Sequence, residues 1–199
     1  MSKIDIRVGG LGGQGVILCA SIIGKAAAIH DNKHATLIQS FGPEARGSAC
    51  SAQVMIDDHP IGYPYVKSLD VLVVMSRDAY KQFVTQLKPG GILLYEEELV
   101  TPGAMPPGVS AYAIPATRFA EQLGRRLVLN IVMVGFFAGV TGLLSEQAVE
   151  KAVLSSVPKG TEDLNLRAYR KGFEYGREQV ESRRLESAAN GQTQQSFAI

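Results

Sequence analysis

The chain has 199 residues, of which 46% are hydrophobic and 20% are charged, and its formal net charge at pH 7 is +1. This length suits one α/β domain with a sizeable core, and the composition is typical of a globular protein rather than a disordered one. The small net charge provides no field that would gather nucleic acid, which excludes that class of partner. No long apolar run precedes the first glycines, so we expect no secretory signal and a cytoplasmic protein.

The cysteines and histidines do not form a metal-binding pattern. Cys19 and Cys50 have no C-x-x-C companion, whereas an iron–sulfur cluster normally takes four thiolates. His30 and His34 have i,i+4 spacing, but the turn-like residues between them favour a solvated loop over a metal site. We therefore expect this chain alone to hold no metal and no cluster.

The first third of the chain predicts a strand, a glycine turn, a helix and two more strands. Residues 3–8 form the first strand, which runs directly into seven residues that contain five glycines, 9–15. From Val16 onward apolar residues recur at the spacing of one buried helical stripe. A second strand is predicted over 35–41, and the alternation that starts at Cys50 predicts a half-buried third strand.

The middle of the chain continues the alternation of strands and helices. The apolar run 70–75 is typical of a parallel strand covered on both faces. Residues 78–87 are helical in composition, and Pro89-Gly90-Gly91 is expected to end that helix before a strand at 92–95. The pattern predicts a doubly wound, mostly parallel Rossmann-like α/β sheet with helices on both faces.

Residues 127–144 are nearly apolar and include Gly135 and Gly139 in G-x-x-x-G spacing, so a membrane helix is one interpretation. Asn130 and Thr141 within the segment favour a buried helix instead, whose glycines let it lie close to a neighbouring helix or a partner subunit. We predict the buried helix and no membrane association.

The C-terminal part predicts two helices and a polar tail. A short helix is expected over 146–154 and a second from Asp163 onward. Past Glu178 the sequence becomes charged and then rich in small polar residues, too polar to bury. We therefore predict one domain over 1–178 and a C-terminal tail over 179–199 that is disordered, or ordered only against a partner.

Gly10, Gly12 and Gly15 satisfy G-x-G-x-x-G after a predicted strand and before a helix, with Gly13 and Gln14 between them. Glycines permit close backbone approach, and the N–H groups of a helix N-terminus attract anions. A nicotinamide site also needs an acidic residue where the second strand ends, but that strand ends in 39–41, Gln-Ser-Phe. A structural turn and an anion site shared with a partner therefore both remain open.

A second set of polar residues follows the second strand: Ser40, Glu44, Arg46 and Gly47. Arg46 could hold a carboxylate or a phosphate, with Glu44 orienting it, or the two could pair in a surface loop. Ser76 follows the next buried strand and is a ligand contact or, by preference, a helix N-cap. The sequence contains neither G-x-S-x-G nor H-E-x-x-H, and we assign no catalytic residue.

Several separated motifs together resemble the gamma subunits of 2-oxoacid:ferredoxin oxidoreductases, over about residues 4 to 178. They are Gly10-Leu11-Gly12-Gly13-Gln14-Gly15-Val16, Gly42-Pro43-Glu44-Ala45-Arg46-Gly47, the run 70–76, Asn130-Ile131-Val132-Met133-Val134-Gly135, Asn165-Leu166-Arg167-Ala168-Tyr169 and Gly172-Phe173. The segment 44–47 with Gly62-Tyr63-Pro64 looks more like the 2-oxoglutarate branch than the pyruvate branch. Gly124-Arg125-Arg126 departs from many relatives, which have a small polar residue after the glycine.

The resemblance implies a subunit of an enzyme that oxidatively decarboxylates a 2-oxoacid with coenzyme A and reduces ferredoxin. It implies partners, the alpha, beta and possibly delta subunits, which hold the thiamine diphosphate and the iron–sulfur clusters. Two alternatives are a free-standing nucleotide-binding oxidoreductase and a purely structural assembly subunit. The expected ligand or interface edge comprises Gly10, Gly12, Gly13, Gln14, Gly15, Ser40, Glu44, Arg46, Gly47 and Ser76.

Overall fold

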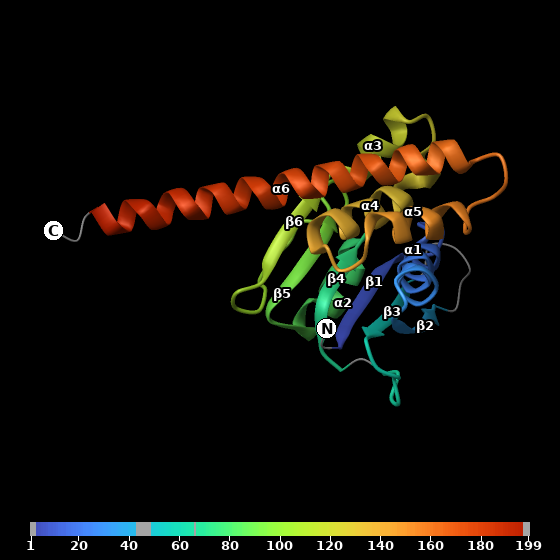
Figure 1. The fold of residues 1–199 in the computed structure, drawn as a ribbon, viewed down its shortest axis with the longest axis horizontal. Helices are drawn as coiled ribbons and strands as arrows, with labels where there is room; N and C mark the ends of the chain where they lie inside the picture. Colours follow the sequence, from blue (N-terminus) through green and yellow to red (C-terminus); the bar gives the residue numbers. More distant parts are fainter. Residues whose placement is uncertain (1–2, 43–48, 66, 197–199) are drawn as a thin grey trace.

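Six strands form one sheet in the order β2-β3-β1-β4-β5-β6 (Figure 1). A computed structural model of the chain describes residues 3–42, 49–65 and 67–196, with side chains as far as Ala188. The strands are β1 (Ile4–Leu11), β2 (His34–Phe41), β3 (Ala49–Asp57), β4 (Leu69–Val74), β5 (Leu87–Glu96) and β6 (Ser110–Ile114). The strands β1, β4, β5 and β6 are parallel neighbours, and β3 runs antiparallel to both β1 and β2. The predicted mostly parallel sheet is confirmed.

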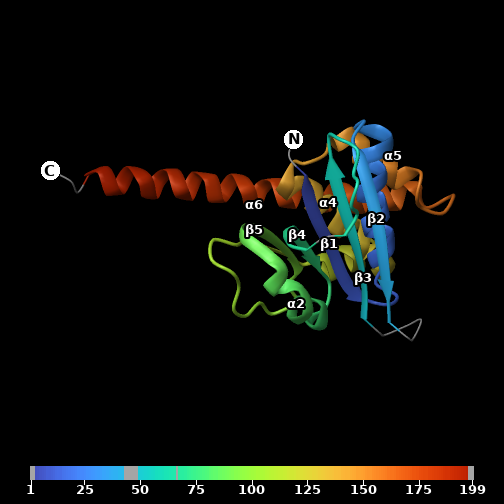
Figure 2. The same cartoon turned by 90° about the horizontal axis from the view of Figure 1, so that it is seen from below.

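Helices cover both faces of the sheet, as predicted, but unequally. They are α1 (Val16–Lys25) with its π-helical extension η1 (Ala26–His30), α2 (Arg77–Phe83) with the 3₁₀ turn η2 (Val84–Gln86), α3 (Ala116–Gln122), η3 (Arg126–Val128), α4 (Leu129–Thr141), α5 (Glu146–Leu154) and α6 (Glu162–Ser196). Alternate residues of β4 point to opposite faces: Val71 and Val73 join the main core, whereas Leu72 and Val74 pack with α2. Figure 2 shows α2 on the face opposite α4 and α6.

Two parts of the middle region differ from the sequence-based expectation. Pro89-Gly90-Gly91 lies inside β5 rather than before it, because the preceding helix already ends within 83–86. The pairing of β5 with β4 is irregular there, and Gly90 has a φ of 76°, which suits an irregular start to a strand. The sequence did not predict β6 and α3, whose short lengths leave little periodicity to detect.

Helices α4 and α6 approach each other through glycines. A Cβ atom added to Gly135 or Gly139 of α4 would fall on the backbone carbonyl of a residue in α6, and one added to Gly172 of α6 would fall on the carbonyl of Val132 in α4. Nearly every residue of α4 is buried within the protein. The predicted buried helix is therefore confirmed, and its glycine spacing serves contact with a neighbouring helix of the same chain. Within the described residues, no helix is both long and apolar enough to cross a membrane.

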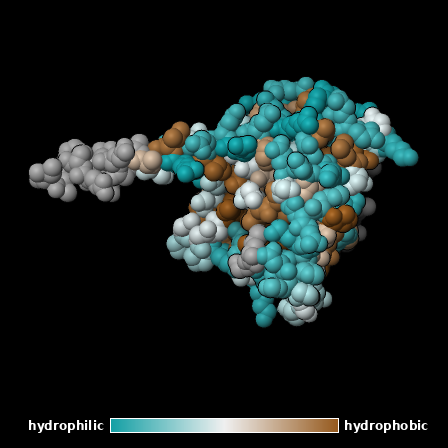
Figure 3. Space-filling view, viewed as in Figure 1, coloured by the Kyte–Doolittle hydropathy of each residue, from teal (hydrophilic) through white to brown (hydrophobic). Residues whose placement is uncertain are grey.

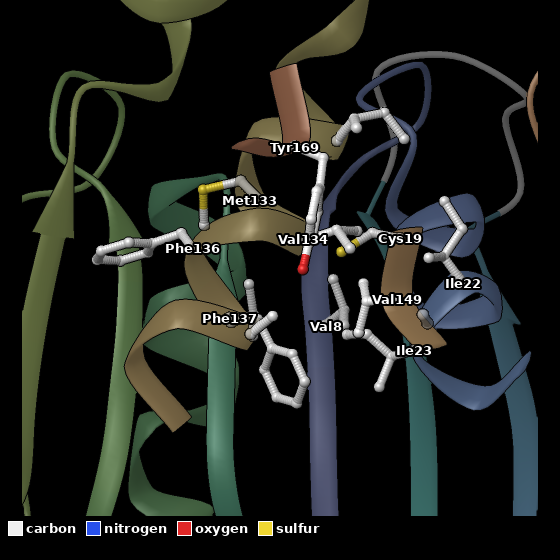
Figure 4. Packing of buried hydrophobic residues seen from close by; sticks show 14 of the residues in the cluster. Val8, Cys19, Ile22, Ile23, Met133, Val134, Phe136, Phe137, Val149 and Tyr169 are labelled. Carbon is white, nitrogen blue, oxygen red and sulfur yellow. The ribbon is translucent and has the colours of Figure 1, made fainter. Parts of the chain in front are cut away.

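The main core lies between α1, α4, α5 and β1, as Figure 4 shows. Cys19 is fully buried there, and burial raises the pKa of its thiol to about 12, as expected for an inert cysteine. Tyr169 of α6 also points into this core, and among the described residues its buried hydroxyl has no hydrogen-bond partner. Burial is the main reason why the pKa of Tyr169 lies far above its ordinary value.

Helix α6 continues beyond the body of the protein as an arm (Figure 1). Before it leaves, Gln179 Nε2 donates a hydrogen bond of 2.6 Å to the Ala113 carbonyl of β6, and Arg183 donates to the Ala111 carbonyl. Helix α6 thus continues past residue 178, where we expected the domain to end. The division into a domain over 1–178 and a tail over 179–199 stays a prediction. Figure 3 shows a mainly hydrophilic surface on this side, with hydrophobic residues gathered below α6.

Candidate functional site

The candidate site lies at the edge of the sheet where the parallel strands have their carboxyl ends. The glycine turn follows β1 at this edge, and Ser76 follows the neighbouring strand β4. The chain leaves β1 toward β2 and leaves β4 toward β5, so the strand order changes direction between them. Ligands in open α/β sheets bind at such a switch point.

Gln14 spans this switch point. Its Oε1 accepts a hydrogen bond of 2.6 Å from the Leu11 N–H, and its Nε2 donates one of 2.8 Å to the Met75 carbonyl. The Gln14 backbone N–H also donates to the Leu11 carbonyl at 3.1 Å. The side chain therefore fixes the glycine turn to the end of β4 and occupies the place between the two strand ends.

Internal contacts account for two of the glycines in the turn. A Cβ on Gly10 would lie 2.6 Å from Gln14 Oε1, and one on Gly15 would lie 2.6 Å from Asn130 Cγ. Gly15 has a φ of 73°, which favours glycine, and its carbonyl accepts a hydrogen bond of 3.4 Å from Asn130 Nδ2. Gly13, with a φ of 96°, has open space where its Cβ would be. Two of the three glycines in the G-x-G-x-x-G pattern thus have a structural basis that requires no ligand.

Ser76 is a helix N-cap. Its Oγ accepts a hydrogen bond of 3.2 Å from the Ala79 N–H in the first turn of α2, and the residue is buried. This agrees with the preferred interpretation from the sequence, because an N-cap serine satisfies a donor that the helix cannot. A contact between Ser76 and a ligand stays a prediction.

Two clefts flank the glycine turn. The first, of about 210 Å³, lies on the α2 side and is lined by residues of β2, β3 and α2 together with Gly10: Ser40, Phe41, Gly42, Ala49, Cys50, Ser51, Ala79, Gln82 and Phe83. The second, of about 300 Å³, lies on the α4 side and is lined by Gly13, Gln14, Leu99, Arg126, Leu127 and Leu129. Of the predicted residues, Gly10 and Ser40 line the first cleft and Gly13 and Gln14 line the second, whereas Gly12, Gly15 and Ser76 line neither. Glu44, Arg46 and Gly47 lie outside the described residues.

The sequence did not single out Glu96, which supports the second cleft. This fully buried carboxylate accepts a hydrogen bond of 2.6 Å from the Leu99 N–H and one of 3.1 Å from the Thr117 N–H. It therefore holds the Leu99 backbone in place beside the cleft. In the sequence Glu96 is followed by two more glutamates, so no feature of the sequence distinguishes this buried residue from the members of a solvated acidic run.

Arg7 supports the first cleft and was also missed. Its guanidinium lies 4.4 Å from the ring centre of Phe83, a cleft residue, and the side chain is buried. Burial lowers the pKa of Arg7, and its Nε has no hydrogen-bond partner among the described residues. As for metal ligands, the described part of the chain contains no group of three or more histidine, cysteine, aspartate or glutamate residues that could hold an ion.

Comparison with known proteins identifies the family. The family model described as pyruvate ferredoxin/flavodoxin oxidoreductase matches residues 5–175. The chain belongs to this oxidoreductase family. A 2-oxoglutarate synthase subunit KorC of Methanocaldococcus jannaschii is 47% identical over 176 residues, which are 87% of this chain and 94% of that protein. A pyruvate synthase subunit PorC of Methanothermobacter thermautotrophicus is 36% identical over 86% of this chain and 94% of that protein.

Solved structures of the oxidoreductase family agree with the fold. The gamma subunit of a keto/oxoacid ferredoxin oxidoreductase from Geobacter sulfurreducens matches with a TM-score of 0.76 and 38% identity, over 87% of this chain and 98% of that one. The 2-oxoglutarate:ferredoxin oxidoreductase of Magnetococcus marinus matches with a TM-score of 0.79 and 25% identity, over 88% of this chain but 31% of that one. The resemblance to gamma subunits is therefore confirmed, and the Magnetococcus protein carries the same domain within a longer chain.

Proposed function

We propose that this chain is the gamma subunit of a 2-oxoglutarate:ferredoxin oxidoreductase. The observation that carries the choice of substrate is the identity that three relatives share with the chain. Three KorC subunits of 2-oxoglutarate synthases are 43–47% identical to it, above the 36–38% of two PorC subunits of pyruvate synthases over a similar length, and a fourth KorC, of Archaeoglobus fulgidus, is 31% identical. The structure of the Magnetococcus relative contains 2-oxoglutarate, coenzyme A and succinyl-CoA.

The reaction converts 2-oxoglutarate and coenzyme A into succinyl-CoA and carbon dioxide. It releases two electrons and one proton, and two molecules of oxidised ferredoxin each accept one electron. Thiamine diphosphate and iron–sulfur clusters would supply the carbanion and electron-transfer chemistry from the alpha, beta and possibly delta subunits. The gamma chain does not work alone in this proposal, and it acts in the cytoplasm as part of the assembled enzyme.

The contribution of the gamma subunit is an edge of the shared site. The proposed edge consists of the glycine turn after β1, the end of β2 with the segment that follows it, and the start of α2: Gly10, Gly12, Gly13, Gln14, Gly15, Ser40, Glu44, Arg46, Gly47 and Ser76. Two clefts open at this edge, and Arg46 carries a charge that suits a carboxylate or phosphate of a substrate. The residues would position or bind substrate, and none would take part in bond formation.

Reconstitution tests the substrate and the dependence on partners. The chain would be produced together with the alpha, beta and, where present, delta chains of the same enzyme, and ferredoxin reduction would be measured with 2-oxoglutarate, pyruvate and 2-oxoisovalerate. We expect the highest kcat/KM with 2-oxoglutarate and no turnover by the isolated chain. A preference for pyruvate would refute the choice of substrate, and turnover by the chain alone would refute the dependence.

Substitutions in the assembled enzyme test the site. Arg46→Gln and Ser40→Ala should raise the KM for coenzyme A or 2-oxoglutarate while the complex still assembles. Arg167→Gln is a matched control, because Arg167 is half-exposed on α6 and, among the described residues, forms its ion pair with Asp163 one helical turn away, at 3.1 Å. Unchanged kinetics in both test variants would contradict a site at this edge.

A purely structural subunit is the second candidate, and the internal contacts of Gly10 and Gly15 favour it. In that case Arg46→Gln would weaken assembly without changing the KM of whatever complex forms. A free-standing nucleotide-binding oxidoreductase lacks comparable support, since β2 ends without a carboxylate and Gln14 occupies the switch point. Titration of the isolated chain with NADH, NADPH and flavins checks it, and micromolar binding would favour that function.

A further inference from the structure

The two edge strands of the sheet, β6 and β2, differ in what covers their outer backbone groups. At one edge α6 covers β6, where Gln179 and Arg183 donate hydrogen bonds to the carbonyls of Ala113 and Ala111. These side chains occupy acceptors that another strand would need. At the other edge β2 is the terminal strand of the sheet, and in the described chain β3, α1 and η1 pack against it but no strand lies beyond it (Figure 2).

The strand β2 has none of the usual features that prevent edge-to-edge pairing. It is eight residues long, with the sequence HATLIQSF, and contains no lysine, arginine, acidic residue or proline. The pairing of β2 with β3 is continuous from His34 to Phe41, without a bulge. Natural proteins usually protect a long edge strand with charge, proline or a bulge, so an unprotected one indicates a pairing surface.

The ladder between β2 and β3 shows which backbone groups face outward. Gly42 donates its N–H to the carbonyl of Ala49, the residue opposite it, so the even-numbered residues of β2 bond inward to β3. Because bonded and non-bonded pairs alternate in an antiparallel ladder, the N–H and C=O groups of Ala35, Leu37, Gln39 and Phe41 point away from the sheet.

We propose that β2 pairs with β2 of a second copy of this chain, antiparallel and across a twofold axis at Ile38. In this register Ala35 faces Phe41 of the other copy and Leu37 faces Gln39. All four outward-facing residues of each strand are then used, and Ile38 faces its own equivalent. A twofold interface requires such a self-complementary pattern, because each contact occurs twice.

The side chains fit the same register. Ala35 and Leu37 pack on the face that α1 and η1 cover, so Phe41, of the same parity, belongs to that face too. Phe41 is 67% exposed, and so is Ile29 on η1, which packs against β2. The twofold places the large Phe41 ring of one copy over the small Ala35 of the other, on the side where η1 carries Ile29. The pairing therefore covers apolar side chains that water otherwise surrounds.

Disulfide formation tests the register. In a background with Cys50→Ser, Ile38→Cys should form an intermolecular disulfide under mild oxidation, because a non-hydrogen-bonded pair places its Cα atoms about 4.5 Å apart. Thr36→Cys is the matched control, since it lies two residues away on the same strand and face and is likewise half-buried. Its equivalent would lie about 14 Å away across the axis, four residues along the strand.

We expect Ile38→Cys to cross-link at least about tenfold faster than Thr36→Cys. Equal rates, or no cross-link in either variant, would overturn the proposal. Two further measurements need no substitution. Sedimentation of the full wild-type chain should show a dimer. Hydrogen exchange should show that the backbone amides of Leu37 and Gln39 exchange more slowly with solvent in that dimer than in the dilute monomer. A monomer at all concentrations, with those amides protected only in the complex with other subunits, would assign the edge to a different partner and overturn the proposal.

Discussion

Gly172 provides the sharpest test of how α4 and α6 are held together. A methyl group at this position would overlap the backbone carbonyl of Val132 and lie 2.9 Å from the Phe136 nitrogen. Both obstacles are backbone atoms of a buried helix, so neither can rotate away as a side chain would. The Gly172→Ala substitution therefore forces α6 to move away from α4 along a stretch where the two helices are in close contact.

The change in the free energy of unfolding that Gly172→Ala should cause is the sum of two opposing contributions. Alanine in a helix is favoured over glycine by about 1 kcal/mol, whereas overpacking a core costs about 1–3 kcal/mol and occasionally more. Because the overlap at Gly172 is with backbone, we expect the upper end of that range and a net loss of about 2 kcal/mol or more in the free energy of unfolding. Two other helical glycines serve as graded controls. At Gly176 the added methyl would lie 3.0 Å from the Phe136 carbonyl, and at Gly24 it would meet only Val54 Cγ1, at 3.9 Å.

Urea denaturation of the three Gly→Ala variants of the isolated chain provides the measurement. Gly24→Ala should be stabilised by about 0.5–1 kcal/mol, Gly176→Ala should change little, and Gly172→Ala should be the least stable. If Gly172→Ala were as stable as Gly24→Ala, the close approach of the two helices would not be a feature of the protein in solution, and the reasoning would fail.

Three further outcomes follow from polar side chains that are buried or partly buried. Tyr169→Phe removes a hydroxyl that lacks a partner among the described residues, so it should leave the melting temperature unchanged or raise it by a few degrees. Burial raises the pKa of Asp5, whose Oδ2 lies 3.4 Å from Lys3 Nζ, so its ionised form opposes folding at neutral pH. Asp5→Asn should therefore stabilise the chain at pH 7, and the gain in the free energy of unfolding should shrink as the pH falls through that raised pKa. Gln14→Ala should lower the melting temperature and speed proteolysis at the glycine turn, whereas an unchanged cleavage rate would argue against its bridging role.

The helices and strands whose signals are local were predictable from the sequence. Residues 146–154 were predicted as a helix from the spacing of their apolar residues, and α5 has the same bounds. In the structure Ser145 caps this helix by accepting a hydrogen bond of 3.2 Å from the Ala148 N–H. The run 70–75 marks β4, which spans Leu69–Val74, to within one residue, since a strand buried on both faces is apolar over most of its length and Asp70 is its one charged residue. By contrast, β6 has five residues of intermediate hydrophobicity, and its place in the sheet depends on pairing with β5.

The candidate site was predictable in position but not in its contacts. A glycine turn after the first strand and Ser76 after a neighbouring parallel strand belong at one edge of the sheet by the rules of α/β topology. The role of Gln14 depends on Met75, which is 61 positions away, and the role of Glu96 depends on Thr117, 21 positions away. No local pattern reports such a pairing, because only the folded sheet brings these residues together.

The contacts of the glycine turn also explain why a motif typical of nucleotide-binding proteins occurs in a subunit of a larger enzyme. In a dinucleotide site the glycines leave room for a pyrophosphate at the helix N-terminus. Here Gln14 and Asn130 take up the space beside Gly10 and Gly15, while Gly13 faces open space and lines the second cleft. At Gly13 the turn is therefore open on the side of α4, whereas Gln14 fills the switch point. Enlarging Gly13 should disturb binding on that side and leave the first cleft, on the α2 side, unchanged.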